Sequence, residues 1–305
     1  MLTMFIVIPF LFGWQMPAGT DLVILVASLA ITGIPHGAID HVIYKHHHPA
    51  KAKGAVFLLT FFVPYILMLT ATLVMWLFFP TLMFWFFLLV SAYHFGQSQL
   101  YYVSLSERHV LKVAVYIVWG VFVLSNLWYH HWVAQQVSIQ SLFDWDLSVG
   151  SALHQVVNVT RFVSAGLWAV FMIYLIRKKM IKPLMLLQEL LVIGLLYLLI
   201  KFTTMYLAFA IYFGIWHSLR VILTEYHHLQ KQTNDTISLI QFCKAFIPFS
   251  LISFGGIVLL FVASYFLESL VSPFMLFLVF ISALTMPHAY VMHEMYARMG
   301  QKLHA

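Results

Sequence analysis

Charged residues are scarce in this chain, and their scarcity excludes an ordinary soluble domain. Only 9% of the 305 residues are Asp, Glu, Lys or Arg, whereas 63% are hydrophobic; soluble domains carry about 25% charged residues. The alternation of polar and apolar residues that builds a membrane β-barrel is also missing. Instead, apolar runs of about twenty residues recur, each long enough to cross a bilayer core of about 30 Å. We therefore predict an all-α, polytopic transmembrane helical bundle.

Several common catalytic signatures are absent as well. The single cysteine, Cys243, excludes an internal disulfide and a metal site built from cysteines alone. The chain has no Walker loop, dinucleotide-binding glycine fingerprint or GxSxG elbow. It also lacks the HxxxH and HxxHH boxes of membrane desaturases, and His293-Glu294 does not continue into the HExxH motif of zinc proteases. Any metal chemistry must therefore use another arrangement of histidines.

The apolar segments and their loops predict the topology. We count about ten segments, over residues 1–16, 22–43, 55–79, 81–101, 110–128, 157–176, 184–200, 203–223, 239–264 and 272–293. With ten spans nearly all the basic loop residues fall on one face of the membrane, and only Arg161 and Lys201 fall on the other. By the positive-inside rule the basic face is cytoplasmic, so we expect both termini in the cytoplasm.

This topology also accounts for the positive net charge of +6. Because the basic residues lie in short loops between membrane segments, we expect no nucleic-acid partner. No repeat or long linker divides the chain. We therefore expect residues 1–305 to form a single integral-membrane domain, embedded in the lipid bilayer of the cell (inner) membrane.

Four of the segments each carry a histidine at a similar depth. His36, His94, His217 and His288 lie about 13–16 residues from the predicted outer ends of their segments, or about 20 Å at 1.5 Å per residue. Imidazole is the commonest protein metal ligand, and a set of imidazoles suits Fe, Cu or Zn. A lone membrane histidine more often bonds a neighbouring helix. The matched depth of four favours a shared metal site.

Other polar residues near these four admit more than one interpretation. Asp40 lies one helical turn beyond His36, where it either orients a ligand by accepting a hydrogen bond or pairs with a basic residue. His41 and His293 follow their partners by five residues and stay reserve ligands because nearby prolines bend the helices. The tract at 46–48 is interpreted as interfacial, and the pair at 227–228 as solvated.

Four short motifs surround the deep histidines: Pro35-His36-Gly37-Ala38-Ile39-Asp40, His94-Phe95-Gly96, His217-Ser218-Leu219-Arg220 and Pro287-His288. In order, approximate spacing and hydropathy they resemble the Brp/Blh family of membrane β-carotene 15,15'-dioxygenases. The resemblance implies a non-haem enzyme that uses Fe(2+) and O2 to split the central double bond of β-carotene into two molecules of retinal. It also implies that the retinal commonly supplies a microbial rhodopsin.

The resemblance further implies a set of iron ligands. The family's proposed ligands correspond to His36, His94 and His217, and a fourth is usually placed four residues after the third. Here that position is Val221, so the sequence departs from the pattern. We expect His288 to complete the set; otherwise the site has three ligands, or the protein is a relative with altered chemistry.

Two other functions stay open. The chain would be a non-catalytic carotenoid- or retinal-binding membrane protein if the change at Val221 abolished metal binding. It would be a proton-coupled transporter if the deep histidines relay protons, although we find no internal symmetry of the kind transporters show. Metal content and O2-dependent loss of carotenoid colour separate the enzyme from the first, and pH-dependent flux separates it from the second.

Overall fold

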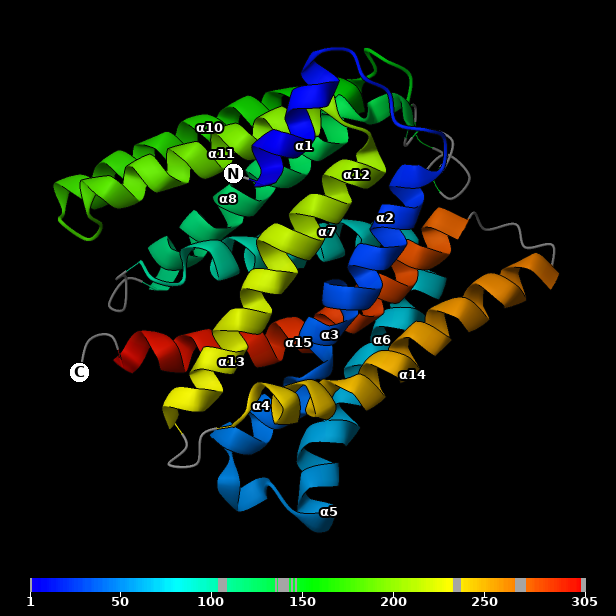
Figure 1. Cartoon of the computed structure of the whole chain (residues 1–305), viewed down its shortest axis with the longest axis vertical. Helices are drawn as coiled ribbons and strands as arrows, with labels where there is room; N and C mark the ends of the chain where they lie inside the picture. Colours follow the sequence, from blue (N-terminus) through cyan, green and yellow to red (C-terminus); the bar gives the residue numbers. More distant parts are fainter. Residues whose placement is uncertain are drawn as a thin grey trace. The chain divides into compact units, whose positions relative to one another are not determined.

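The computed structural model (Figure 1) describes residues 2–103, 109–134, 136, 143, 145, 147–232, 237–266 and 273–302. All regular elements in these ranges are helical, and none of these residues forms a β-strand. The predicted all-α class is therefore confirmed.

The helices differ widely in length. The α-helices are α1 Leu2–Leu11, α2 Thr20–Ser28, α3 Ile34–Ala38, α4 Asp40–His47, α5 Gly54–Phe57, α6 Val63–Phe78, α7 Pro80–Leu100, α8 His109–His130, α10 Ala152–Arg177, α11 Pro183–Phe202, α12 Met205–Phe209, α13 Arg220–Gln232, α14 Leu239–Phe266 and α15 Pro273–Lys302. Wider π-helical segments occupy Leu29–Gly33, Leu58–Phe62 and Ala210–Leu219, and a 3₁₀ turn occupies Pro49–Lys51. Several short helices therefore join through π-helical segments into longer continuous rods.

Eight helical stretches of the described chain are long and apolar enough to cross a membrane. They cover Thr20–His47, Gly54–Phe78, Val110–His130, Ala152–Arg177, Pro183–Phe202, Met205–Gln230, Leu239–Leu259 and Met275–Gly300. Of the other two predicted segments, α1 has only 10 residues, and the second half of α7 contains His94, Gln97 and Gln99, which lower its hydropathy. The eight stretches fit a multi-pass membrane protein, whereas the count of ten and the side of the termini stay predictions.

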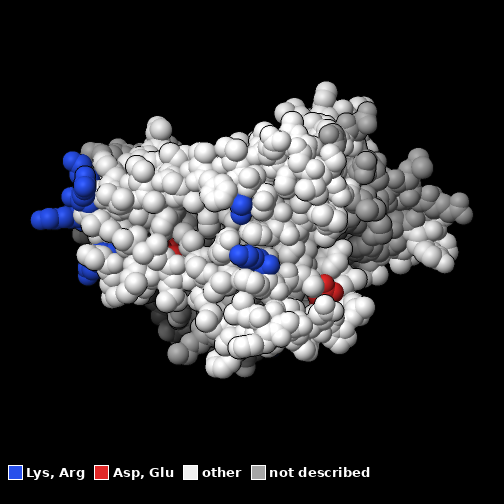
Figure 2. Space-filling model, turned by 90° about the horizontal axis from the view of Figure 1, so that it is seen from above, with Lys and Arg blue, Asp and Glu red and all other residues white. Residues whose placement is uncertain are grey.

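The surface is apolar over long stretches. Phe12, Leu77 and Ile252 are 88%, 80% and 70% exposed. Figure 2 shows a face on which uncharged side chains predominate, with a group of Lys and Arg side chains at its left-hand end. Extensive exposed apolar surface marks a site of contact with a membrane or a partner, and here lipid explains it.

The chain folds into two compact units, and each has its own packing. The first unit comprises Met1–Leu29, Ala92–Val137 and Trp145–His217. In it α8 packs against α10, α11 and α12, while α1 packs against α11 and α2 packs against α12. Whether residues 1–305 act as one domain stays a prediction.

Two glycines bring helices of the first unit into direct backbone contact. A Cβ atom added to Gly96 on α7 would overlap the backbone of Tyr116 on α8. A Cβ atom added to Gly120 would likewise overlap the backbone of Ala92. Small residues allow such close helix approach in membranes. This crossing therefore sets the position of His94, two residues before Gly96.

The second unit comprises Ala30–Ser91, Ser138–Asp144 and Ser218–Ala305. Its longest helix, α15, packs against α3, α4, α6 and α14. The indole nitrogen of Trp76 on α6 donates a 2.6 Å hydrogen bond to Ser282 on α15. Helix α13 packs against α3 and α4, so the four helices α3, α4, α13 and α15 converge around one region of this unit.

Candidate metal centre

His36 is held by the local shape of its own helix. A π-helical segment ends at Gly33, and α3 begins immediately afterwards with Pro35 in its first turn. The Nδ1 atom of His36 bonds to the carbonyl oxygen of Gly33. Because a carbonyl can only accept, Nδ1 carries the proton, and Nε2 is the nitrogen that has the lone pair. The His36 side chain is only 6% exposed.

Two of the other deep histidines lie together within the first unit. His94 on α7 and His217, in the π-helical segment Ala210–Leu219, are 2% and 3% exposed. Their ring centroids are 4.9 Å apart, and the ring planes are nearly perpendicular. Phe95 and Phe213 lie beside His217, with ring centroids 4.8 and 5.6 Å from it. The two imidazoles therefore lie together in an apolar, aromatic surrounding.

Ser98 determines which nitrogen of His217 has the lone pair. The Ser98 hydroxyl donates its proton to the carbonyl oxygen of Phe95 at 2.9 Å. It therefore accepts from His217, whose Nδ1 lies 3.1 Å away. His217 consequently has its proton on Nδ1 and its lone pair on Nε2, the same tautomer as His36.

His288 receives the same support from a carboxylate. On α15 the Nδ1 atom of His288 lies 2.9 Å from Oδ1 of Asp40, and the two side chains are both buried. Asp40 also accepts a 3.1 Å hydrogen bond from the Tyr65 hydroxyl. The ring of His288 contacts that of His36, with centroids 4.6 Å apart and planes at 88°. A carboxylate on the outer nitrogen of a histidine is typical of metal ligands.

This contact decides between the two interpretations of Asp40. The backbone breaks at Ile39, where φ is −88° and ψ is −6°, so Asp40 begins a new helix, α4. Asp40 bonds to His288 on another helix, and so the first interpretation, hydrogen bonding to a candidate ligand, is the one observed.

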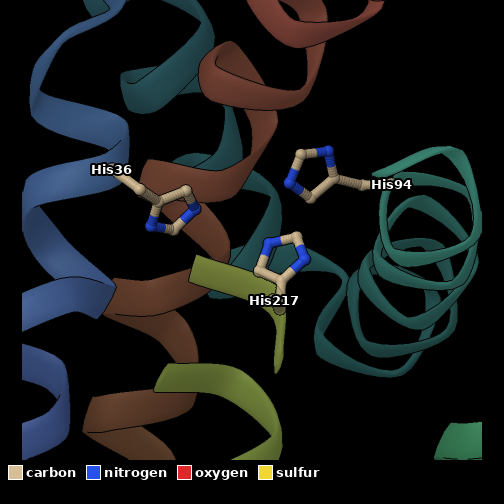
Figure 3. A group of neighbouring side chains, drawn as sticks. All are labelled: His36, His94 and His217. Carbon is tan, nitrogen blue, oxygen red and sulfur yellow. The ribbon is translucent and has the colours of Figure 1, made fainter. Parts of the chain in front are cut away.

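Three of the four deep histidines form a recognisable ligand group. Figure 3 draws His36, His94 and His217, which are all buried and each offer one ring nitrogen. A buried set of three imidazoles of this kind could hold a metal ion. His288 is outside this group of three, although its ring contacts that of His36.

The two reserve ligands lie elsewhere. The ring of His41 packs on Phe249 of α14 with centroids 4.5 Å apart, and its Nδ1 bonds the carbonyl of Ala38 at 3.1 Å. His293 is exposed. Neither belongs to the group of three histidines found among the described residues.

Sequence reasoning missed the residues that support the ligands. Ser98 follows His94 by four residues, so its position on the same helical face was a usable signal. Tyr65 gave no such signal. Glu225 on α13 is 0% exposed, and neither carboxylate oxygen has a hydrogen-bond partner among the described residues. An acidic residue inside an apolar span marks a functional candidate and was a second missed signal.

Two histidines outside the four are buried. His228 was expected in solvent, and its exposed fraction of only 5% shows that this expectation is wrong; His47, expected at the membrane interface, is 7% exposed, and its place relative to the membrane stays a prediction. They are buried because α13 packs against α4, which a reading of each segment alone does not reveal. Val221, at the position of the family's usual fourth ligand, is 1% exposed and purely apolar.

Comparison with known proteins gave one finding. A family model described as "Beta-carotene 15,15'-dioxygenase" matches residues 27–296, a range that contains all four deep histidines and their motifs. Neither a search of curated proteins nor a search of solved structures found a match.

Proposed function

Because the chain belongs to the beta-carotene 15,15'-dioxygenase family, we propose that it cleaves the central double bond of β-carotene with O2 and releases two molecules of retinal. The observation that carries this proposal is the buried group of His36, His94 and His217 inside a membrane chain. The hydrocarbon substrate is soluble in the same bilayer. We further propose that the protein resides in the cell membrane and that the retinal passes to a microbial rhodopsin.

The donor set fits a ferrous ion. His36, His94 and His217 would hold Fe(2+), and His288 would complete the set in place of the family's usual ligand at Val221. Imidazoles suit iron, and in His36, His217 and His288 the proton is committed to Nδ1. Each of these three therefore presents the lone pair of Nε2, which is what a metal ion requires.

Other side chains of the site orient the histidine rings. Asp40 holds His288 through Nδ1, and Ser98 does the same for His217. Such partners fix the tautomer and direction of a ligand. The aromatic rings of Phe95 and Phe213 keep water away from His217, and a dry site limits side reactions of oxygen.

The stoichiometry of the reaction is consistent with a site built from histidines. Both atoms of O2 end in the two aldehyde groups, so the cleavage needs no external reductant and no net transfer of protons. When bound, the ferrous ion supplies the one-electron chemistry that allows O2 to react with a closed-shell alkene. The protein contributes the burial of the site and the alignment of the polyene's central bond.

The test is retinal formation in a carotene-accumulating bacterial host that expresses the chain. We expect loss of colour together with retinal, and neither in the His36→Ala or His288→Ala variants. His41→Ala is the matched control, because His41 packs on Phe249 away from the ligand group. Activity that survives His288→Ala removes His288 from the ligand set. A folded, iron-supplied wild type that retains intact carotene would instead indicate a carotenoid-binding relative.

A further inference from the structure

A second gathering of metal-ligating side chains lies in the second unit, where α4, α13 and α15 meet. It consists of His46, His47 and His48 at the end of α4, His228 on α13 and Glu294 on α15. None of these residues belongs to the four motifs around the deep histidines. The proposed carotene cleavage leaves the whole gathering without a role.

Two imidazoles of this group, those of His47 and His228, contact each other through their ring nitrogens. The Nε2 atoms of His47 and His228 are 2.9 Å apart, and the ring planes are perpendicular, at 89°. Zinc binds histidine nitrogens at about 2.0–2.1 Å, so two such nitrogens on a tetrahedral ion lie about 3.3 Å apart. A separation of 2.9 Å is within about half an ångström of that value. Only a small opening of the pair would admit an ion.

The other nitrogen of His47 faces a carboxylate. Its Nδ1 atom lies 4.0 Å from Oε1 of Glu294. Glu294 is itself held by His48 at 2.9 Å and by Arg298 at 2.7 Å. This order of carboxylate, histidine and lone-pair nitrogen is the arrangement that orients histidine ligands in metal sites. A small shift of the carboxylate toward His47 would complete it.

A third imidazole stands beside the pair. The ring of His46 has its centroid 6.0 Å from that of His47 and 6.1 Å from that of His228. Three imidazoles on one tetrahedral ion have centroids about 5 Å apart. His46 is half-buried, so its side chain can rotate to close this difference.

From this geometry we infer that His47, His228 and His46 form a second metal site, which takes a divalent transition-metal ion such as Zn(2+) or Fe(2+). Three imidazoles and a nearby carboxylate are a borderline donor set that prefers such ions to Mg(2+) or Ca(2+). The site is separate from the His36 group and does not depend on the proposed cleavage reaction. The competing explanation is a metal-free pair of neutral imidazoles, in which Nε2 of one ring donates a hydrogen bond to Nε2 of the other and the two rings share that proton.

The test is a metal titration of the full-length protein, purified in detergent and freed of metal by a chelator. Zn(2+) content is measured by mass spectrometry, and Co(2+) absorption in the visible range reports imidazole coordination. We expect the wild type to bind one equivalent more Zn(2+) than His228→Gln or His47→Gln. The glutamine amide can keep the hydrogen bond but cannot replace the imidazole ligand. His227→Gln is the matched control from the neighbouring position on α13; because His227 is exposed and outside the proposed site, this variant should bind as much metal as the wild type.

Two further variants keep the outcomes distinct. His36→Gln should lose the equivalent of the deep histidine group and keep the one at His47 and His228. If a buried glutamine prevents folding, His46→Gln, at a half-buried position, should still weaken the second equivalent by at least about tenfold. Equal metal binding by the wild type, His228→Gln and His46→Gln would overturn the second site in favour of the shared proton. Loss of metal confined to His36→Gln would do the same.

Discussion

The bond between Asp40 and His288 provides the sharpest prediction about the composition of the metal centre. The change is Asp40→Asn, which keeps the size of the side chain and removes its charge. A hydrogen bond to a charged group contributes about 1.5–3 kcal/mol, and the loss of a carboxylate behind a metal-bound histidine lowers affinity about 10–100-fold. Because 1.4 kcal/mol corresponds to about a factor of ten, the two ranges agree. We expect Fe(2+) affinity to fall about 10–100-fold.

The assay is competition between the purified protein and a coloured Fe(2+) chelator. Tyr65→Phe is the matched control, because it removes the other hydrogen bond to Asp40 and leaves the bond to His288 in place. Its effect on affinity should be clearly smaller. In protein that already carries His288→Ala, Asp40→Asn should change nothing further, since the two residues act as one pair. An unchanged affinity in folded Asp40→Asn, or an equal loss in both backgrounds, would refute this role.

Three more predictions test other parts of the molecule. Gly96→Ala should lower the free energy of unfolding by about 2–3 kcal/mol because a Cβ would overlap the Tyr116 backbone. Gly166→Ala should raise the free energy of unfolding by about 0.5–1 kcal/mol, because a Cβ atom at this helical position meets no other atom. Equal effects of the two substitutions in denaturant titrations would contradict the close crossing. Ser98→Ala should lower metal affinity about tenfold by releasing the His217 ring, and Ser98→Thr should restore it. With labelled O2, and retinal reduced at once to block exchange with water, mass spectrometry should find one labelled oxygen in every retinal-derived molecule. Label in only half of these molecules would exclude a dioxygenase.

The large-scale features could be predicted from the sequence because lipid imposes them. Scarce charge and long apolar runs require helices, since backbone groups in a bilayer must bond within their own segment. His36, His94, His217 and His288 are all buried within the fold, whereas their shared depth in the membrane stays a prediction.

The finer features depend on contacts between distant segments and could not be predicted. The hydrogen bond between Asp40 and His288 joins residues that are 248 positions apart in the sequence. The burial of His47 and His228 arises where α4 meets α13, 181 residues apart in sequence. Both histidines lie near helix ends in polar sequence, and such a local sequence predicts side chains that are exposed to solvent. The two segments bury each other only after folding.

The central claim is that the buried histidines hold an iron with which the protein makes retinal. The most direct measurement is a single preparation of purified, iron-loaded protein, given β-carotene without oxygen and then exposed to O2. This claim predicts that the wild type forms two molecules of retinal for each β-carotene consumed. It also predicts that folded His94→Gln neither retains iron at this centre nor forms retinal. Intact β-carotene bound to folded, iron-loaded wild-type protein after exposure to O2 would contradict it.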